Sequence, residues 1–547
     1  MKQIRKILLQ LFVTGILISA FVPSLIAQSL SRPKLVVGIV VDQMRWDYLY
    51  RYYDRYEDGG FKRFFNEGFS CENTFINYLP SYTAVGHSTI FTGSIPAIHG
   101  ITGNDWIDLT TGRHWYCTED TTVQSVGTTS AEGEMSPRNL LVSTVTDELR
   151  LATNFQSKVI GVSLKDRASI LPAGHTATGA FWFDDASGNF ITSTYYMKDL
   201  PDWVKNFNSN KDPEKLIAND WNPLYPINTY KQSTEDAEPW EGLFGSEKTS
   251  AFPHHISTVY KQNKGYIRST PFGNTLTLDF AKAALDGNKL GQGTATDFLT
   301  INCASTDYVG HMFGPNSIEV EDTYLRLDKE LAGFFKYLDD KVGKGNYTVF
   351  LTADHGAAHS IGFMMEHNLP GDFFRSSDLL NRLNVLLAQK FGVNGLVISG
   401  MNYHVNFNLN KIDSLKINYD AVKKVAVNFL KEQPGVQFAV DIDQIGLSPI
   451  PEPIKKMIIN GYNSKRCGSV MLIPEPGWFD GFTRGTTHGN WNPYDTHIPL
   501  LFFGWGIQHG STNRETHMTD IAPTIAALLH IQMPNGAVGK VITEVKK

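Results

Sequence analysis

Three aspartates in this sequence follow apolar runs that are typical of buried strands. Asp42 and Asp354 come directly after such runs, and Asp307 lies five residues beyond a third one. In open α/β sheets, ligands bind just beyond the carboxyl ends of the strands. A single aspartate after a strand is more often a helix cap or a turn residue, so the coincidence of three carries the interpretation. We therefore expect these carboxylates to meet at one edge of one sheet.

Histidines near these aspartates supply a second type of metal ligand. His311 lies four residues after Asp307, which places both on one face of a helix or tight turn. His355 follows Asp354 directly, and His488 follows a loop rich in Gly and Thr; alone, His488 would more often be a surface residue. Aspartate and neutral imidazole suit zinc, with manganese or iron as chemical alternatives.

A hydroxyl nucleophile can be placed beside such a cluster. Residues 80–89 predict a turn followed by a helix, with Thr83 at the helix N-terminus. Free backbone N–H groups there bind anions, and a metal ion can activate a hydroxyl by stabilising its alkoxide. The commoner role of threonine at this position is to cap the helix. Ser81, Ser88 and Thr89 are rival hydroxyls that spacing alone does not exclude.

Strands alternating with helices must position these residues. Helical patterns at 317–338 and 519–529 lie between apolar runs rich in Val, Ile, Leu or Phe, as in parallel strands that are covered on both faces. This alternation predicts an α/β layered core. The four runs that we expect to be parallel strands are 35–41, 298–302, 347–352 and 500–503.

Two long stretches fit this alternation less well. Residues 168–290 are rich in Trp, Tyr, Pro, Asn and Lys, which indicates loops with short elements. Residues 377–480 contain a strand–helix–strand pattern of their own. We interpret both stretches as insertions into one core that form cap segments.

Composition excludes some classes of function. The 547 residues, 42% of them hydrophobic, are ample for a large packed core. The net charge is −6, and no Lys/Arg block of the kind that follows a nucleic-acid backbone is present. A small anionic substrate would therefore have to be attracted by local charge, such as metal ions or a few basic residues.

The N-terminus has the layout of a secretory signal. A basic start precedes the apolar run 7–21, and small residues lead to an expected cleavage between Ala27 and Gln28. An uncleaved membrane anchor is the alternative, but polar residues interrupt the run. We expect residues 1–27 to be removed and the mature chain, 28–547, to be periplasmic or secreted without stable membrane insertion.

Export would permit disulfides between the four cysteines, which allow three pairings. Their wide spacing does not suit a zinc knuckle. We expect the pairs Cys71–Cys117 and Cys303–Cys467.

Taken in chain order, these residues resemble the alkaline phosphatase superfamily, and most closely its PafA-type periplasmic zinc enzymes with a threonine nucleophile. Residues 99–104 match the segment after the nucleophile helix, and residues 519–524 match a usual C-terminal marker. The resemblance covers most of the mature chain. Its motifs are specific when taken together, whereas no single motif is. It implies a three-layer α/β/α sandwich with a mostly parallel central sheet. The full set is Asp42, Thr83, Asp307-x-x-x-His311, Asp354-His355-Gly356 and Thr487-His488-Gly489.

The resemblance also implies two zinc ions, with Thr83 beside the second as nucleophile and further ligand. The first ion would be held by Asp307, His311 and His488, and the second by Asp42, Asp354 and His355.

Three further residues would then contact the phosphoryl oxygens: Asn104, Lys165 and Arg167. Without the resemblance, Lys165 and Arg167 would be two charges on a solvated face, although they follow another strand-like run, 159–162. Two positive charges favour a dianionic phosphate monoester over a diester. The pair also suggests that no third, magnesium site is needed. The predicted activity is monoester hydrolysis through a phosphothreonine intermediate.

Other functions remain open at this stage. A phosphodiesterase or nucleotide pyrophosphatase of the same superfamily is the first rival, and Lys165 with Arg167 argues against it. A sulfatase is disfavoured because no Cys-x-Pro-x-Arg or Ser-x-Pro-x-Arg motif occurs. A cofactor-independent phosphoglycerate mutase is disfavoured by the export signal and by threonine in place of serine. A binding protein on a decayed enzyme scaffold is disfavoured by the complete ligand set. The oligomeric state is not predicted.

Overall fold

An 11-stranded sheet crosses the protein, and its four central strands are parallel. Strand β1 (Leu35–Val41) lies between β9 (Asp297–Cys303) and β10 (Tyr347–Thr352), and β6 (Val159–Val162) lies on the other side of β9. Every residue of these four strands is buried, as their Val, Ile, Leu and Phe content predicts. The register aligns the carboxyl ends of β1, β9 and β10, so the segments that follow them begin at one edge.

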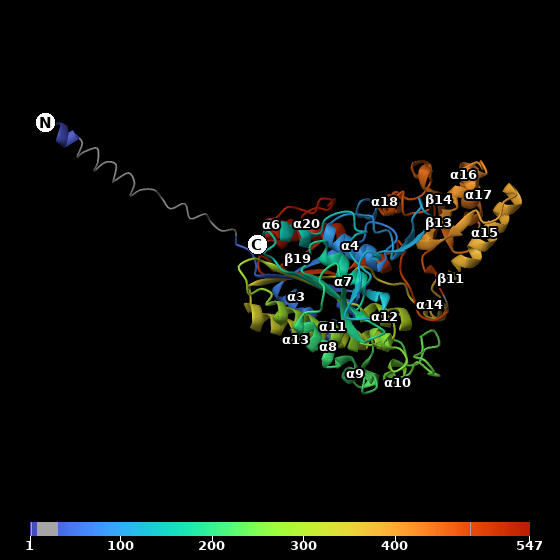
Figure 1. Ribbon diagram of the computed structural model, residues 1–547. Coiled ribbons are helices and arrows are strands. Elements are labelled where there is room, and N and C mark those ends of the chain that lie inside the picture. Colours follow the sequence, from blue (N-terminus) through green and yellow to red (C-terminus); the bar gives the residue numbers. More distant parts are fainter. Residues whose placement is uncertain (2, 8–30, 482) are drawn as a thin grey trace. The chain divides into compact units, whose positions relative to one another are not determined.

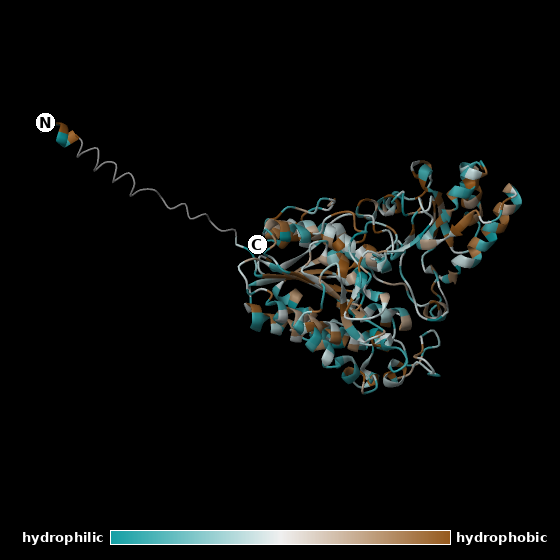
Figure 2. Cartoon of the chain, viewed as in Figure 1, coloured by the Kyte–Doolittle hydropathy of each residue, from teal (hydrophilic) through white to brown (hydrophobic). Residues whose placement is uncertain are grey.

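Helices form a layer on each face of this sheet (Figure 1). On one face, α11 (Phe272–Asn288) packs on β9 and on α13 (Ile318–Leu338). On the other, α4 (Thr83–Thr92) packs on α7 (Asp166–Ala173) and on α20 (Ile521–Leu529), and α7 packs on β6. Figure 2 shows the apolar residues gathered in the strands between the layers. The predicted three-layer α/β/α sandwich is confirmed.

The computed structural model describes residues 1, 3–7, 31–481 and 483–547. The chain divides into Met1–Arg32 and a larger unit, Pro33–Lys547, which holds every candidate site residue. In the first unit, residues 3–7 are helical and exposed. Most of the expected signal and its cleavage site lie outside the described residues. Within the described chain, no helix is long and apolar enough to cross a membrane.

Two expectations about the core are wrong. Strand β18 (Leu500–Gly504) is not parallel: it pairs antiparallel with β10 and with β2 (Phe69–Phe75). An apolar run indicates burial on both faces but says nothing of strand direction. Residues 168–290 are not an insertion throughout, because they include α11 and also β7 (Gly179–Asp184) and β8 (Asn189–Ser193), which extend the main sheet beyond β6. Their many polar residues come from the loops between these elements.

Residues 377–480, here called the inserted segment, have a four-stranded sheet and an apolar core of their own. Helix α18 (Glu452–Gly461) precedes the last strand of this sheet. The other main elements are α15 (Ser376–Phe391), β12 (Val397–Ser399), β13 (His404–Phe407), α17 (Tyr419–Lys431), β14 (Val436–Asp441) and β15 (Val470–Pro474).

All four cysteines are free and buried, so both predicted disulfides are wrong. Cys71 lies in β2 and Cys303 ends β9, whereas Cys117 and Cys467 lie in loops. Buried thiols behave as small apolar groups, and burial raises the pKa of Cys71 to about 12 and that of Cys467 to about 11. They serve packing here, not cross-linking.

Two helical glycines offer a matched test of how closely α4 packs. A Cβ on Gly86 of α4 would lie 2.5 Å from the carbonyl oxygen of Asp354, whereas a Cβ on Gly333 of α13 would have nothing within 4 Å. Inside a helix, alanine is more favourable than glycine by about 1 kcal/mol. Extra atoms forced into a filled space cost about 1–3 kcal/mol. We expect Gly333→Ala to raise the melting temperature slightly and Gly86→Ala to lower it by a few degrees, as measured by circular dichroism. Equal shifts would contradict this packing.

Candidate active site

The three aspartates lie where their strands end. Asp42 directly follows β1, Asp354 is the second residue after β10, and Asp307 is in the first turn of α12 (Ser305–Phe313), the helix after β9. Because these strands are adjacent and parallel, the carboxylates arrive at the same edge of the sheet. Asp42 and Asp354 are fully buried, and Asp307 is only 4% exposed.

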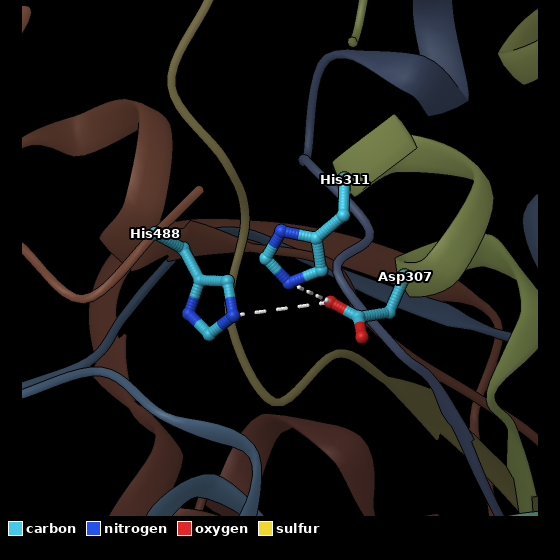
Figure 3. A group of neighbouring side chains, drawn as sticks. All are labelled: Asp307, His311 and His488. Atoms are coloured by element: carbon cyan, nitrogen blue, oxygen red, sulfur yellow. Dashed lines mark ion pairs between the residues drawn. The ribbon is translucent and has the colours of Figure 1, made fainter. Parts of the chain in front are cut away.

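Asp307, His311 and His488 form one cluster (Figure 3). The Nε2 atom of His311 lies 3.1 Å from Oδ1 of Asp307, and Nε2 of His488 lies 3.8 Å from the same oxygen. The first pair is one turn apart on α12, as the spacing predicts. His488 comes from the loop between β16 (Trp478–Asp480) and α19 (Pro493–Thr496). Residues far apart in the chain thus meet around one carboxylate.

Asp42, Asp354 and His355 form a second, adjoining cluster. Nε2 of His355 lies 3.3 Å from Oδ2 of Asp354 and 3.7 Å from Oδ1 of Asp42. The rings of His355 and His488 stack with their centroids 3.4 Å apart, which joins the two clusters. In addition, Asp42, Asp307 and His355 offer ligand atoms within 4.8 Å of one another. The six predicted ligands therefore form one continuous polar centre.

Backbone carbonyls fix the orientation of all three imidazoles. Each Nδ1 atom faces a carbonyl oxygen, which only accepts hydrogen bonds, so Nδ1 carries a hydrogen and Nε2 is the atom turned toward the centre. Each Nε2 atom lies next to a carboxylate of the centre. Metal-binding histidines are commonly oriented in this way. The three contacts are His311 to Thr486 (2.8 Å), His355 to Gly356 (3.0 Å) and His488 to Ser81 (2.7 Å).

Burial shapes the ionisation of this centre. It raises the pKa of Asp42 well above the ordinary value. It also opposes ionisation of Asp307, but His311 and Lys165 outweigh it and hold the pKa of Asp307 well below its usual range. Burial lowers the pKa of His488 well below its ordinary value, so this imidazole is neutral at pH 7, as a metal ligand must be.

Thr83 is the first residue of α4, and its Oγ1 lies 3.4 Å from Nε2 of His355. The N-cap position belongs to Tyr82, so the hydroxyl of Thr83 is not used to cap the helix. Two rival hydroxyls are bonded elsewhere: Ser81 donates to the carbonyl of Asn490, and Thr89 pairs with a histidine ring behind the helix. Of these hydroxyls, only that of Thr83 contacts a residue of the polar centre.

Asn104 packs against the start of the same helix. Its Oδ1 atom lies 3.0 Å from the backbone nitrogen of Ala84. A backbone N–H only donates, so the oxygen of the amide faces the helix and the two hydrogens on Nδ2 point elsewhere. The contact with Ala84 therefore leaves both Nδ2 hydrogens available to another group.

Lys165 and Arg167 differ in their surroundings. Nζ of Lys165 lies 2.9 Å from Oδ2 of Asp42 and 2.6 Å from Oδ2 of Asp307, and these carboxylates raise its pKa despite burial. Arg167 donates to the hydroxyl of Tyr116 at 3.0 Å, and within the described chain it has no ion pair with a carboxylate. The structure thus places Lys165 among the ligand carboxylates and leaves Arg167 as the freer cation.

Two residues of this centre are not predicted from the sequence. His87 lies one turn after Thr83 on α4, and its Nδ1 is 2.9 Å from the carbonyl oxygen of Thr83 and 3.4 Å from Oδ2 of Asp354. Gln43 donates from its backbone to Asp354 and from its side chain to Asp307, at 3.1 Å and 2.7 Å. The four-residue spacing that singled out His311 after Asp307 also occurs between Thr83 and His87, and was the available signal.

The donor set fits divalent cations. Oδ1 of Asp42 and Oδ2 of Asp354 are buried and have no hydrogen-bond partner among the described residues. A buried charged oxygen without a partner is costly, and a cation next to it removes the cost. The groups that converge are carboxylate oxygens and neutral imidazole nitrogens, a combination that suits transition-metal dications.

Comparison with known proteins identifies the family. A family model described as type I phosphodiesterase / nucleotide pyrophosphatase matches residues 36–497. The chain belongs to this family. Because the family is part of the alkaline phosphatase superfamily, the predicted family and the predicted class of enzyme are confirmed.

Several relatives of this phosphodiesterase-family chain cover nearly its whole length. It is 60% identical to alkaline phosphatase PafA of Elizabethkingia meningoseptica, over 94% of each chain. It is 55% identical to alkaline phosphatase PhoV of Synechococcus elongatus, over 96% of this chain and 95% of that one. A Myroides odoratus protein named calcium-transporting ATPase is 55% identical over 95% and 96% of the two chains. The crystal structure of PafA superposes with a TM-score of 0.94 at 59% identity, covering 95% of this chain and 100% of that one.

The tautomer of His87 leads to a test of its role. Asparagine places a donor near the position of Nδ1, whereas glutamine places one near Nε2. We expect His87→Asn to keep metal affinity and kcat near those of the parent, because it can still donate to the carbonyl oxygen of Thr83. His87→Gln should lose about 10-fold in both, the usual cost of removing a residue that orients a ligand. Chelator competition and phosphatase assays measure this, and equal losses in the two variants would contradict it.

Proposed function

We propose that the protein is an exported alkaline phosphatase that hydrolyses phosphate monoesters through a phosphothreonine on Thr83, with two zinc ions as cofactors. The observation that carries the proposal is the meeting of three carboxylates and three imidazoles in one centre, which the Thr83 hydroxyl contacts through His355. The names of the PafA and PhoV relatives support the same activity.

The chain's own residues define the course of the reaction. Thr83 begins α4, where the helix dipole and free N–H groups favour a bound phosphoryl group. Its Oγ1 attacks phosphorus, the bond to the ester oxygen breaks, and the alcohol leaves after taking up a proton. Water then attacks the phosphothreonine, releases phosphate and restores the hydroxyl. Such a loose transition state depends on positioning and on charge stabilisation.

The cofactor assignment follows the two clusters. Asp307, His311 and His488 would hold one zinc ion, and the other would be held by Asp42, Asp354 and His355, with Thr83 beside it. When bound, such a pair of ions stabilises the attacking and leaving oxygens of an in-line displacement. The Nε2 atoms of the three imidazoles already face the carboxylates, because each Nδ1 atom bonds to a backbone carbonyl.

Substrate recognition would rest on Asn104, Lys165 and Arg167. Asn104 presents its amide hydrogens beside the start of α4. Arg167 keeps its charge, because Tyr116 and other neighbours raise its pKa despite burial. Lys165 already contacts two carboxylates. A phosphoryl dianion bound next to Thr83 would also be attracted to its positive charge. Two cations suit a dianionic monoester better than a diester with one charge fewer.

We also infer that residues 1–27 direct export and that the mature enzyme acts in the periplasm or outside the cell. Its partners would be small phosphate monoesters. The net charge of −6 and the lack of a basic block argue against nucleic acid as a partner.

Removing the Thr83 hydroxyl tests the nucleophile. We expect Thr83→Ala to lower kcat for p-nitrophenyl phosphate at least about 1,000-fold, because loss of a nucleophile removes the covalent route. Ser88→Ala, which removes a rival hydroxyl of the same helix, should leave kcat within a few-fold. Zinc content by mass spectrometry should be two per chain in the parent and in Ser88→Ala, and chelation should abolish activity. Turnover in Thr83→Ala equal to the parent would refute the proposal.

The basic pair distinguishes a monoesterase from the rival phosphodiesterase. We expect Arg167→Ala to reduce kcat/KM for p-nitrophenyl phosphate by about 10-fold or more, the value of one charge-assisted hydrogen bond. The Lys165→Ala, Arg167→Ala double variant should lose more. Hydrolysis of bis-p-nitrophenyl phosphate by the same preparations should fall much less, which also controls for folding. Equal losses on both substrates would overturn the assignment.

Nucleotide hydrolysis is the remaining comparison. The family model is described by phosphodiester and pyrophosphate chemistry, and one relative is named an ATPase. Rates on ATP and on an aryl phosphate, measured with one preparation, rank these activities. We expect the simple monoester to be hydrolysed at least as efficiently as ATP, because the proposed contacts of Asn104, Lys165 and Arg167 are all to the phosphoryl group.

A further inference from the structure

The inserted segment bonds to the backbone on both sides of the nucleophile helix. Asn460, in α18, donates from Nδ2 to the carbonyl of Asn77 at 2.7 Å, before the helix begins. Arg466 donates from Nη1 to the carbonyl of Gly100, after the helix ends, and its guanidinium carbon lies 4.6 Å from the ring centre of Trp106. The inserted segment thus contacts the loops on which Thr83 and Asn104 depend.

Asn402, in the inserted segment, contacts the residues on both sides of Asn104. Its Nδ2 atom donates to the carbonyl oxygen of Asp105 at 2.7 Å. The backbone of Asn402 has φ of +59°, a left-handed conformation that asparagine adopts more readily than most residues. The approach is close, because a Cβ on Gly103 would lie 2.3 Å from that same Nδ2 atom. The glycine at position 103 leaves room for this contact, and the asparagine at position 402 tolerates the backbone conformation that it requires.

Residues 103–105, which lead into the short strand β3 (Asp105–Ile107), are held at several points. On one side, Oδ1 of Asn104 accepts the N–H of Ala84 at the start of α4. On the other, Asn402 holds the carbonyl of Asp105. The backbone here is also held by the carbonyl of Asn104, which accepts from Cys117 at 2.9 Å, and by the pairing of Asp105 with Tyr116, so Asn402 adds a restraint from outside this strand pair. Loops that carry functional groups depend on such external restraints.

We propose that Asn402 is a positioning residue, through which the inserted segment holds Asn104 in the orientation that receives a phosphoryl oxygen. This inference rests on the proposed role of Asn104 in substrate binding. Asn402 touches no reacting atom, so its contribution passes through the loop. A misplacement of about 1 Å in a group that binds the transition state is enough to slow a reaction severely. The inserted segment then contributes to catalysis as well as covering the core.

A double-mutant cycle tests the proposal. Asn402→Asp keeps the shape of the side chain but removes the donor, and we expect kcat/KM for p-nitrophenyl phosphate to fall about 3- to 10-fold. In an Asn104→Ala background the same substitution should change kcat/KM less than 2-fold, because the group that it positions is already gone. An effect of the same size in both backgrounds would overturn the proposal.

Asn384→Asp is the matched control within the inserted segment. Asn384 bonds to the backbone of Val397, also in the inserted segment, through both atoms of its amide, so its loss perturbs that segment without touching residues 103–105. We expect its kcat/KM to stay within 2-fold of the parent. A loss as large as that of Asn402→Asp would mean that general weakening of the inserted segment explains both, and the proposal would fall.

Hydrogen exchange separates this proposal from the proposed phosphatase function. Amide exchange in a peptide covering residues 99–107 should be faster in Asn402→Asp than in the parent, and unchanged in Asn384→Asp. This readout needs no turnover, so it remains valid even if the protein proves to have a different substrate. Unchanged exchange in Asn402→Asp would refute the positioning role whatever the activity.

Gly103→Ala gives a second, opposite perturbation of the same contact. The added Cβ would push the loop away from Asn402. We expect it to lower kcat/KM to a similar extent, and to have no further effect once Asn402 is replaced by glycine, because the clash is then absent. Additive effects of Gly103→Ala and Asn402→Gly would contradict the shared contact.

Discussion

The dominant constraint on this structure is the concentration of negative charge at one edge of a buried sheet. β1, β9 and β10 are adjacent, parallel and in register, so the residues that follow them bring three buried carboxylates together. Like charges in a medium of low polarity repel strongly, and each also loses its hydration. The surrounding residues reduce the energetic cost of this arrangement.

Three kinds of group balance the charge. Lys165 contacts Asp42 and Asp307 directly, and Gln43 donates to Asp307 and Asp354. His311 adds a further contact to Asp307. Even so, one oxygen each of Asp42 and Asp354 has no hydrogen-bond partner within the described chain. Because the balance is incomplete, the same feature that threatens stability makes this centre a candidate site for cations.

The sequence predicted the centre better than its surroundings. Apolar runs lead directly to Asp42 and Asp354 and, after a short gap, to Asp307, so local pattern indicated both the strands and the candidate ligands that follow them. The direction of β18 was not predictable, because pairing depends on the path of the chain between strands and not on composition. The contribution of β7 and β8 to the main sheet was hidden by the long polar loops around them. The cysteines were misassigned because spacing along the chain does not report distance in space.

Contacts between remote segments were beyond the reach of sequence patterns. Nothing local indicates that the Nδ1 of His488 would face the carbonyl of Ser81, yet that contact sets the direction of the ligand atom. The pairing of Lys165 with two ligand carboxylates is of the same kind, since the strand that leads to it lies beside β9 only in the folded sheet.

These remote contacts share one chemical design. Backbone carbonyls receive the Nδ1 hydrogens of the three ligand histidines, and backbone carbonyls also receive the side chains of Asn402, Asn460 and Arg466 from the inserted segment. A carbonyl is present at every position of a chain whatever its side chain, and it only accepts. Holding functional groups by carbonyls therefore fixes which atom points into the site while leaving the side chains of the holding segments free to vary. It also means that the geometry of the centre depends on the paths of loops, so a segment that never touches the reacting atoms can still decide where they lie.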